Sequence, residues 1–180
     1  MNNRILVTGA NGFVGKSLVD YLCRKRYDVL SVVRNPNARE NNVQVVPSFG
    51  SNTDFEEVLA GRDCVIHCAA RVHIMDDKVE NPLELYREAN TAGTVNLAKQ
   101  AVAAGVKKFI FISSIKVNGE STPLNIPFNY DQACFPEDPY GVSKMEAEIG
   151  LREIAKETGM EVVIIRPPLV YGPGVKANFA

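Results

Sequence analysis

The chain has 180 residues, of which 46% are hydrophobic and 23% are charged, and its formal net charge is -1. This composition is typical of a globular domain with a hydrophobic core, and it excludes a disordered chain or one drawn electrostatically to nucleic acid or anionic membranes. No apolar run has the length of a membrane span, and the first strand-like run starts at Ile5, which leaves no room for a signal peptide. We therefore expect a cytoplasmic protein with no membrane span and no nucleic-acid partner.

The four cysteines, Cys23, Cys64, Cys68 and Cys134, do not follow a disulfide or metal-ligand pattern. Two of them, Cys64 and Cys68, lie in an apolar run. We expect reduced thiols, as in other cytosolic proteins, and no metal site.

Short apolar runs alternate with helical patterns along the chain. The runs predict strands over 5–7, 29–33, 43–46, 64–68, 109–112 and 162–165, and the helical patterns cover 14–26, 54–59, 82–104 and 139–158. Because most strands are apolar on both faces, we predict an α/β protein with a Rossmann-type, doubly wound parallel sheet, helices on both faces and strand order 3-2-1-4-5-6. Residues 116–137 show no clear period, and a loop of this length within a compact domain tends to be functional.

The first strand leads into a glycine-rich turn, Thr8-Gly-Ala-Asn-Gly-Phe-Val-Gly15, and a helix follows. Glycine permits a tight turn and a close approach of the backbone to a ligand, while the helix N-terminus offers free N–H groups to a phosphate. This arrangement predicts a dinucleotide-binding turn. The predicted contact residues are Gly9, Asn11, Gly12, Phe13, Val14 and Gly15.

Reactive side chains gather at the carboxyl end of the strand 109–112. Ser113 and Ser114 follow that strand, and Tyr140 and Lys144 lie four residues apart on one face of the next helix. A lysine ammonium nearby favours the phenolate, so we expect Lys144 to lower the pKa of Tyr140. A serine hydroxyl can hold a substrate oxygen while Tyr140 moves the proton and hydride passes between carbon and nicotinamide.

Taken together, these motifs resemble the extended short-chain dehydrogenases/reductases of the nucleotide-sugar epimerase/dehydratase family. The matching segments are the glycine turn, His67-Cys-Ala-Ala70, Phe109-Ile-Phe-Ile-Ser-Ser114, Tyr140-Gly-Val-Ser-Lys144 and Arg166-Pro-Pro-Leu-Val-Tyr-Gly-Pro-Gly174. The resemblance implies Ser114, Tyr140 and Lys144 as the catalytic triad, with the tyrosine and lysine also contacting the cofactor. It further implies cofactor contacts from Ala69, Ala70, Asn90, Ser113 and Pro167, and substrate contacts from Ser114, Asn118 and Asn178. The chain departs from the family at Asn118-Gly119, where the family has Tyr-Gly.

The two histidines need separate interpretations. His67 lies inside an apolar strand, so we expect a hydrogen-bonded core histidine and not a catalytic one. His73 lies in the following loop, where a substrate contact and a surface position are equally compatible with the sequence.

The second strand ends at Arg34 without the carboxylate that binds the ribose hydroxyls in NAD-binding versions of this fold. A guanidinium can bind a 2′-phosphate, and Arg39 could assist from the loop. We therefore favour NADP as the cofactor, with NAD as the alternative.

The resemblance favours a UDP-glucose 4-epimerase-like enzyme that transfers hydride and uses tyrosine as the acid–base. Two alternatives stay open: an NADPH-dependent 4-keto-sugar-nucleotide reductase, and a dinucleotide-binding regulatory module without turnover. The family's substrate lobe begins near residue 180, so we expect residues 1–180 to form a dinucleotide-binding domain that is inactive by itself. We also expect a homodimer that packs through the helices 82–104 and 139–158.

Overall fold

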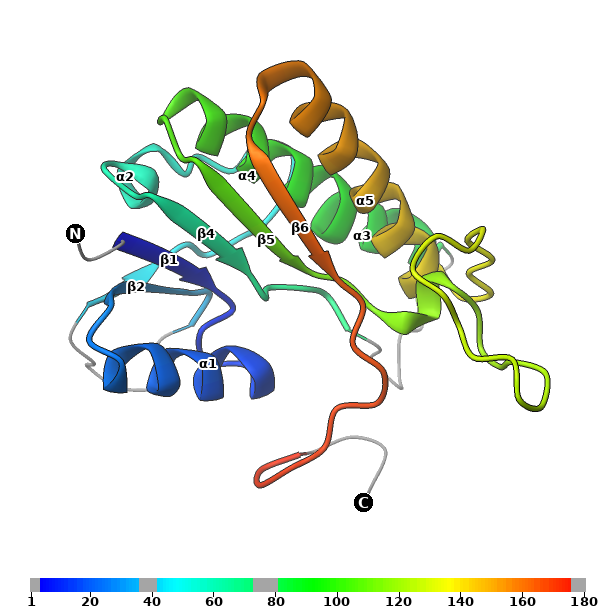
Figure 1. Ribbon diagram of the computed structural model, residues 1–180. Helices are drawn as coiled ribbons and strands as arrows, with labels where there is room; N and C mark the ends of the chain where they lie inside the picture. The colour runs from blue at the N-terminus through cyan, green and yellow to red at the C-terminus, as the bar shows by residue number, and fades with distance from the viewer. Residues whose placement is uncertain (1–3, 36–41, 73–80, 176–180) are drawn as a thin grey trace.

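The computed structural model describes residues 4–35, 42–72 and 81–175, and its centre is a six-stranded parallel sheet (Figure 1). The strands are β1 (Arg4–Thr8), β2 (Asp28–Val33), β3 (Val43–Val45), β4 (Cys64–His67), β5 (Lys108–Ile112) and β6 (Glu161–Ile165). Every pairing is parallel, and the order across the sheet is β3-β2-β1-β4-β5-β6. This order is the one predicted from the sequence.

Helices cover the two faces of the sheet unequally (Figure 1). The helices are α1 (Phe13–Arg24), α2 (Glu56–Leu59), α3 (Pro82–Tyr86), α4 (Gly93–Ala103) and α5 (Pro139–Thr158). The first of them lies under β1 and β2, whereas α3, α4 and α5 lie together on the opposite face. In the part of the chain that the structure describes, no helix combines the length and hydrophobicity of a membrane span.

Alternation along the strands divides the core into two clusters. Leu6 belongs to the cluster under α4 and α5, and its neighbours Ile5 and Val7 belong to the cluster above α1. The second cluster ends before β6, because no helix within the described residues covers that strand from the α1 side. Ile165 is consequently 44% exposed, so the prediction of helices on both faces holds mainly for the centre of the sheet.

The predicted helix over 82–104 is interrupted by a π-helical segment, η1 (Arg87–Ala92), between α3 and α4. Polar side chains of η1 reach different neighbours: Glu88 accepts hydrogen bonds from Ser51, and Asn90 bonds to the backbone of Arg71. The wider π turn accommodates this divergence, and such turns occur frequently at functional sites. An apolar period does not distinguish it from an α-helix.

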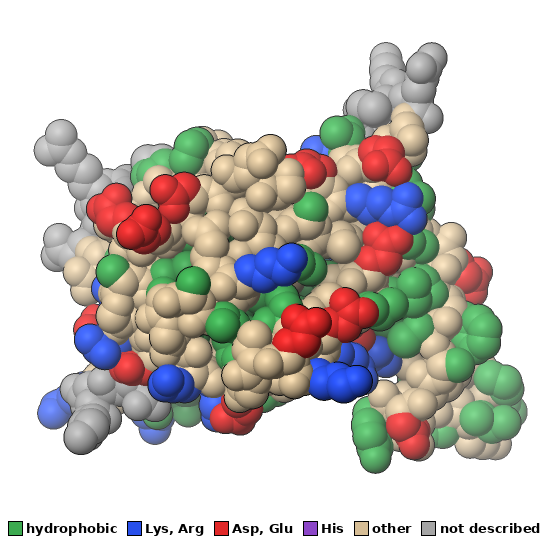
Figure 2. Space-filling view, turned by 90° about the horizontal axis from the view of Figure 1, so that it is seen from above, with side chains coloured by type: hydrophobic (Ala, Val, Ile, Leu, Met, Phe, Trp, Pro, Cys, Tyr) green, Lys and Arg blue, Asp and Glu red, His purple; other side chains and the backbone are tan. Residues whose placement is uncertain are grey.

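A short 3-10 helix, η2 (Ile115–Val117), overlaps the start of the segment 116–137 that was predicted as a loop. The loop exposes large apolar side chains, among them Leu124 at 89% and Tyr130 at 86%. Figure 2 shows hydrophobic side chains gathered at the right-hand end of the molecule, where Figure 1 places this loop. Asp138 then caps α5 by accepting a hydrogen bond from the Gly141 N–H, and Gly159 ends the helix with a φ of 75°.

Candidate cofactor and active site

A cavity of about 440 Å³ lies at the carboxyl ends of the central strands. Most of the residues predicted from the sequence line it, so the glycine turn and the reactive side chains share one space. The predicted residues in its wall are Gly9, Asn11, Gly12, Phe13, Val14, Gly15, Arg34, Ala69, Ala70, Ser113, Ser114, Tyr140, Lys144 and Pro167.

The glycine turn packs backbone against backbone. Gly9 has a φ of +65°, and a Cβ at this position would lie 2.7 Å from the backbone nitrogen of Ala69. A Cβ on Gly15 would lie only 2.1 Å from the carbonyl oxygen of Gly9. Side chains are therefore excluded at both positions, which leaves the backbone of the turn directly on the cavity.

The N-terminus of α1 opens into the same cavity. Its N-cap residue is Gly12, and among the described residues no side chain caps the helix and no acidic residue occupies its first turn. The N–H groups of Phe13, Val14 and Gly15 lie ahead of the first intrahelical bond, which runs from the Lys16 N–H to the Gly12 carbonyl. These groups and the helix dipole fit an anion such as a pyrophosphate.

The Arg34 side of the cavity is fixed by the glycine turn. The Asn11 side-chain amide donates to the carbonyl oxygen of Asn35 at 3.0 Å, and the Ala10 N–H donates to the Val32 carbonyl at 3.3 Å. Arg34 is therefore held next to the turn and lines the cavity. Arg39, the second arginine proposed for this region, lies outside the described residues.

A hydrogen bond joins the side chains of Ser114 and Tyr140, which the sequence places at the same edge of the sheet. A hydrogen bond from Ser114 favours the phenolate of Tyr140, and the Ser114 Oγ also accepts from the Lys116 backbone N–H at 3.2 Å. Burial and the nearby carboxylate of Asp138 outweigh this bond and raise the pKa of Tyr140 to about 12. Tyr140 is therefore protonated at neutral pH in the chain alone.

Lys144 is almost completely buried, with 1% of its surface exposed. Its Nζ lies 4.2 Å from the centre of the Phe111 ring and 6.0 Å from that of Tyr140. Burial lowers the pKa of Lys144 to about 7, although Cys68 and Glu148 act in the opposite direction. The expectation that Lys144 lowers the pKa of Tyr140 is wrong for the chain alone, because burial makes both charged forms unfavourable.

His67 has the structural role that the sequence indicated. Its Nδ1 lies 2.6 Å from the Thr8 Oγ1, its Nε2 lies 3.0 Å from the Thr94 Oγ1, and its ring stacks on Phe111. Burial lowers its pKa to about 3, so the imidazole is neutral and both nitrogens have partners. The other histidine, His73, lies outside the described residues.

Asn90 does not belong to the described cavity wall but supports the loop that does. Its Oδ1 accepts from the Arg71 N–H at 2.7 Å, and its Nδ2 donates to the Arg71 carbonyl and to the Ser143 Oγ, both at 3.0 Å. It thereby connects the segment after β4 to α5. Its predicted contact with the cofactor stays a prediction.

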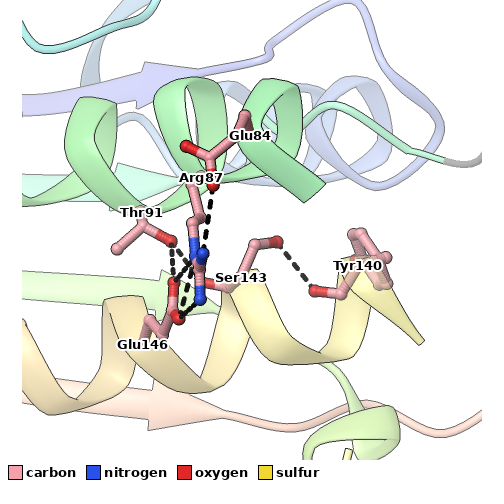
Figure 3. Close-up of polar contacts among 6 residues, drawn as sticks. All are labelled: Glu84, Arg87, Thr91, Tyr140, Ser143 and Glu146. Atoms are coloured by element: carbon pink, nitrogen blue, oxygen red, sulfur yellow. Dashed lines mark hydrogen bonds and ion pairs between the residues drawn. The ribbon is translucent and has the colours of Figure 1, made fainter. Parts of the chain in front are cut away.

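Figure 3 shows how η1 is fastened to the helix that carries Tyr140. Arg87 binds Glu146 on α5 through its Nε and Nη2, and Thr91 donates to the Ser143 carbonyl at 2.9 Å. The Ser143 hydroxyl in turn donates to the Tyr140 carbonyl at 2.8 Å. These contacts fix the first turns of α5 and therefore the position of the tyrosine.

Asn118 also stands apart from the described cavity wall and is 3% exposed. Its Oδ1 accepts from the Arg166 Nη1 at 3.0 Å, and its Nδ2 donates to the Asn129 carbonyl at 3.2 Å. It holds the loop after η2, and its predicted substrate contact stays a prediction. Asn178, the other predicted substrate residue, lies outside the described residues.

The sequence of the chain also matches a known protein family. The sequence profile of the NAD dependent epimerase/dehydratase family matches residues 5–180. The chain belongs to this family.

A UDP-glucose 4-epimerase of Vibrio cholerae is 57% identical over 182 aligned positions, which cover 100% of this chain and 56% of that protein. The chain thus spans about half the length of this curated relative. Among solved structures, the UDP-glucuronic acid 4-epimerase of Bacillus cereus in complex with NAD has a TM-score of 0.80 and 28% identity, over 94% of this chain and 57% of that one. MoeE5, solved with UDP-glucuronic acid and NAD, has a TM-score of 0.83 and 27% identity, over 98% and 58% of the two chains.

Several residues that line the cavity were not predicted from the sequence. They are Phe49, Cys68, Val72, Ile112, Pro168 and Val170. Phe49 comes from the irregular segment after β3, which carries no periodic signal, whereas Cys68 and Pro168 directly adjoin predicted residues. Burial raises the pKa of the Cys68 thiol to about 11, so it stays protonated beside Lys144.

All four cysteines of this family member are free thiols, as expected. Within the described residues, histidine, cysteine and acidic side chains do not gather in groups that could hold a metal ion.

Proposed function

We propose that the chain is the dinucleotide-binding part of a UDP-glucose 4-epimerase-like enzyme. One observation carries this proposal: Ser114, Tyr140 and Lys144 line the same cavity as the uncapped N-terminus of α1. A helix terminus that fits a pyrophosphate would hold a nicotinamide dinucleotide beside an acid–base group. The 57% identity to the Vibrio cholerae UDP-glucose 4-epimerase supports UDP-sugars as the substrate class.

The proposed cofactor is a nicotinamide dinucleotide, which supplies the hydride acceptor and donor when bound. The glycine turn and the free N–H groups at the start of α1 would hold its phosphates. The complexes of MoeE5 and of the Bacillus cereus epimerase contain NAD, which supports that form. Arg34 in the cavity wall supports NADP, and a direct comparison of the two affinities distinguishes them.

The chemistry of the chain's own residues is general acid–base catalysis. Ser114 would hold the oxygen of the sugar hydroxyl, and Tyr140 would take its proton as hydride leaves the same carbon. Tyr140 would return the proton once the carbon had been reduced again from its opposite face, so the net reaction would be an isomerisation without net oxidation. Because the pKa of Tyr140 is about 12 in the chain alone, its action as a base needs a positive charge beyond that of Lys144, which a bound oxidised nicotinamide would add.

Arg34 favours one second candidate, a 4-keto-sugar-nucleotide reductase that uses NADPH. Such a reductase oxidises one NADPH for each ketone that it reduces, whereas an epimerase regenerates its cofactor in every cycle. The stoichiometry of the dinucleotide therefore separates the two reactions.

The test is to incubate the full-length protein with UDP-glucose, UDP-galactose and 4-keto UDP-sugars, and to follow sugars and dinucleotide together. We expect the two hexoses to interconvert without net change in the dinucleotide. Oxidation of one NADPH per product would instead establish the reductase. Tight dinucleotide binding without any turnover would contradict both and leave the regulatory module.

A further inference from the structure

A buried carboxylate lies one helical turn beyond Lys144 on α5. Glu148 is 2% exposed, and its Oε1 accepts hydrogen bonds from the Ser113 Oγ at 2.6 Å and from the Arg166 Nε at 2.9 Å. Its Oε2 accepts from the Arg166 Nη2 at 2.5 Å. Glu148 thus joins the helix that carries Tyr140 and Lys144 to the ends of two strands, β5 and β6.

The same arginine continues this network toward the cavity. Arg166 directly precedes Pro167, which lines the cavity and whose carbonyl accepts from the Ile115 N–H at 3.0 Å. Its Nη1 donates to the Asn118 Oδ1 at 3.0 Å. Ser113, the other partner of Glu148, directly precedes Ser114 and donates its N–H to the Ile165 carbonyl at 2.7 Å. The Glu148–Arg166 ion pair therefore lies next to the segment that carries Ser114 and next to the segment in which Pro167 lines the cavity.

A buried ion pair of this kind is not explained by stability alone. Desolvation of two charges costs about as much as their attraction returns, so replacing such a pair by neutral groups is often harmless to stability. Removing one partner, in contrast, leaves an unpaired buried charge and destabilises strongly. What the pair does provide is a fixed geometry, because a bidentate arginine–carboxylate contact constrains both distance and orientation.

We propose that Glu148 and Arg166 are positioning residues for the hydride-transfer reaction. They hold Ser114 and Pro167 at fixed positions relative to Tyr140 and Lys144. The inference rests on the proposed function. Neither residue needs to touch substrate, because Glu148 acts through Ser113 and Arg166 through the backbone on either side of it. A misplacement of about 1 Å at the reacting groups can reduce the rate by about a hundredfold.

The negative charge of Glu148 also acts on Lys144. The titratable or charged groups that face Lys144 come from several elements: Cys68 and His67 on the β4 side, and Tyr140 and Glu148 on α5. Of these, Glu148 is the carboxylate, and its charge favours the protonated lysine. Loss of this charge should let Lys144 deprotonate at lower pH, which moves the alkaline limb of the activity profile to lower pH.

The test uses the full-length protein and compares Glu148→Gln with the double variant Glu148→Gln/Arg166→Gln. The single variant leaves the Arg166 charge unpaired, so both its melting temperature and its kcat should fall. The double variant removes both charges but keeps amides that can hydrogen-bond. Its melting temperature should return near the wild-type value, while kcat stays at least about tenfold lower and the dinucleotide Kd changes less than about threefold.

A matched control is Glu153→Gln/Lys156→Gln, which removes one charge of each sign from exposed positions on the same helix. This control should keep wild-type kcat and an unchanged pH profile, whereas the alkaline limb of the double variant at 148 and 166 should move to lower pH. Wild-type kcat and pH profile in that double variant would overturn the positioning role and leave the proposed function intact. Absence of turnover in the wild-type protein would overturn the proposed function and the positioning role together.

Discussion

The two ends of the cavity are formed by different kinds of chemical group. At the glycine turn, the wall is backbone: Gly9 and Gly15 exclude side chains, and the start of α1 presents N–H groups. At the other end, the wall consists of buried ionisable side chains, with Tyr140 and Lys144 in front and Glu148 behind them. One end depends on the shape of the main chain, and the other on charges held away from water.

Because of this difference, we expect the backbone end of the cavity to determine dinucleotide binding and the ionisable end to determine the chemical step. A site made of backbone N–H groups has no group that titrates near neutral pH, so its affinity for a dinucleotide should be insensitive to pH. A site made of a lysine with a pKa of about 7 and a tyrosine with a pKa of about 12 changes its charge state with pH. Substitutions at the two ends should consequently change different observables.

The largest expected effect is on turnover, at the ionisable end. Tyr140→Phe removes the phenol oxygen but keeps the ring, so kcat in the full-length protein should fall by about 10²–10⁴-fold, the usual contribution of general acid–base catalysis. Dinucleotide affinity should change little. Steady-state kinetics and a fluorescence titration measure the two quantities, and a variant that keeps more than about a tenth of the wild-type rate contradicts the role of Tyr140.

At the backbone end, Gly15→Ala should weaken dinucleotide binding by about a hundredfold, since an added Cβ would meet the Gly9 carbonyl oxygen at 2.1 Å and overpacking costs up to about 3 kcal/mol. Gly12→Ala is the matched control, because its Cβ would lie at 3.1 Å from the same oxygen and needs a smaller adjustment. Titration of both variants with NADH and NADPH checks the difference. Equal affinities in the two variants would mean that the close approach at Gly15 is not what shapes the site.

Among the described residues that line the cavity, Arg34 is the cationic side chain at the backbone end, and its replacement sharpens the question of the cofactor. Arg34→Asp should weaken NADPH binding by roughly 1.5–3 kcal/mol through loss of a charge-assisted contact, and should shift the preference toward NAD. The measured quantity is the ratio of the two dissociation constants in wild type and variant. An unchanged ratio removes Arg34 from the cofactor site.

The smallest effect concerns stability and belongs to Lys144. Its pKa is about 7 in the folded chain and returns to the ordinary lysine value on unfolding, so above pH 7 the unfolded state binds more protons. The free energy of unfolding should therefore rise with pH between about 7 and 8.5, by up to ~1.4 kcal/mol per pH unit from this group. Lys144→Met should lack this contribution in urea unfolding at both pH values, and equal slopes in the two proteins would contradict it.

The contrast between the backbone end and the ionisable end of the cavity also explains which features the sequence could predict. Strand order and the glycine turn follow from short apolar runs and from glycines at 9, 12 and 15, because local backbone preferences produce both. The sequence also places Ser114 and Tyr140 at the same sheet edge, since strand ends and the next helix meet there in a parallel sheet.

What the sequence did not reveal depends on environment. The pKa of Tyr140 was expected to fall next to Lys144, but it rises, because burial acts on both residues and cannot be read from their spacing. The sequence predicts η1 as part of one continuous helix, because its apolar period is compatible with either geometry. Glu148 stands four residues after Lys144, a spacing that places it on the same face, but only the fold brings Arg166 to it.

The sheet order has a consequence for how the site comes into existence during synthesis. Among the described strands, those of residues 4–45 meet those of residues 64–165 only where β1 pairs with β4, from Ile5 opposite Cys64 to Thr8 opposite His67. The glycine turn belongs to residues 4–45, on one side of this β1–β4 pairing, which we call the seam, and Tyr140 belongs to residues 64–165, on the other side. A nascent chain therefore lacks part of the proposed dinucleotide site until the start of α5 has left the ribosome. Once bound across the seam, a dinucleotide would tie the two halves together, and amide hydrogens of β1 and β4 should then exchange with solvent more slowly.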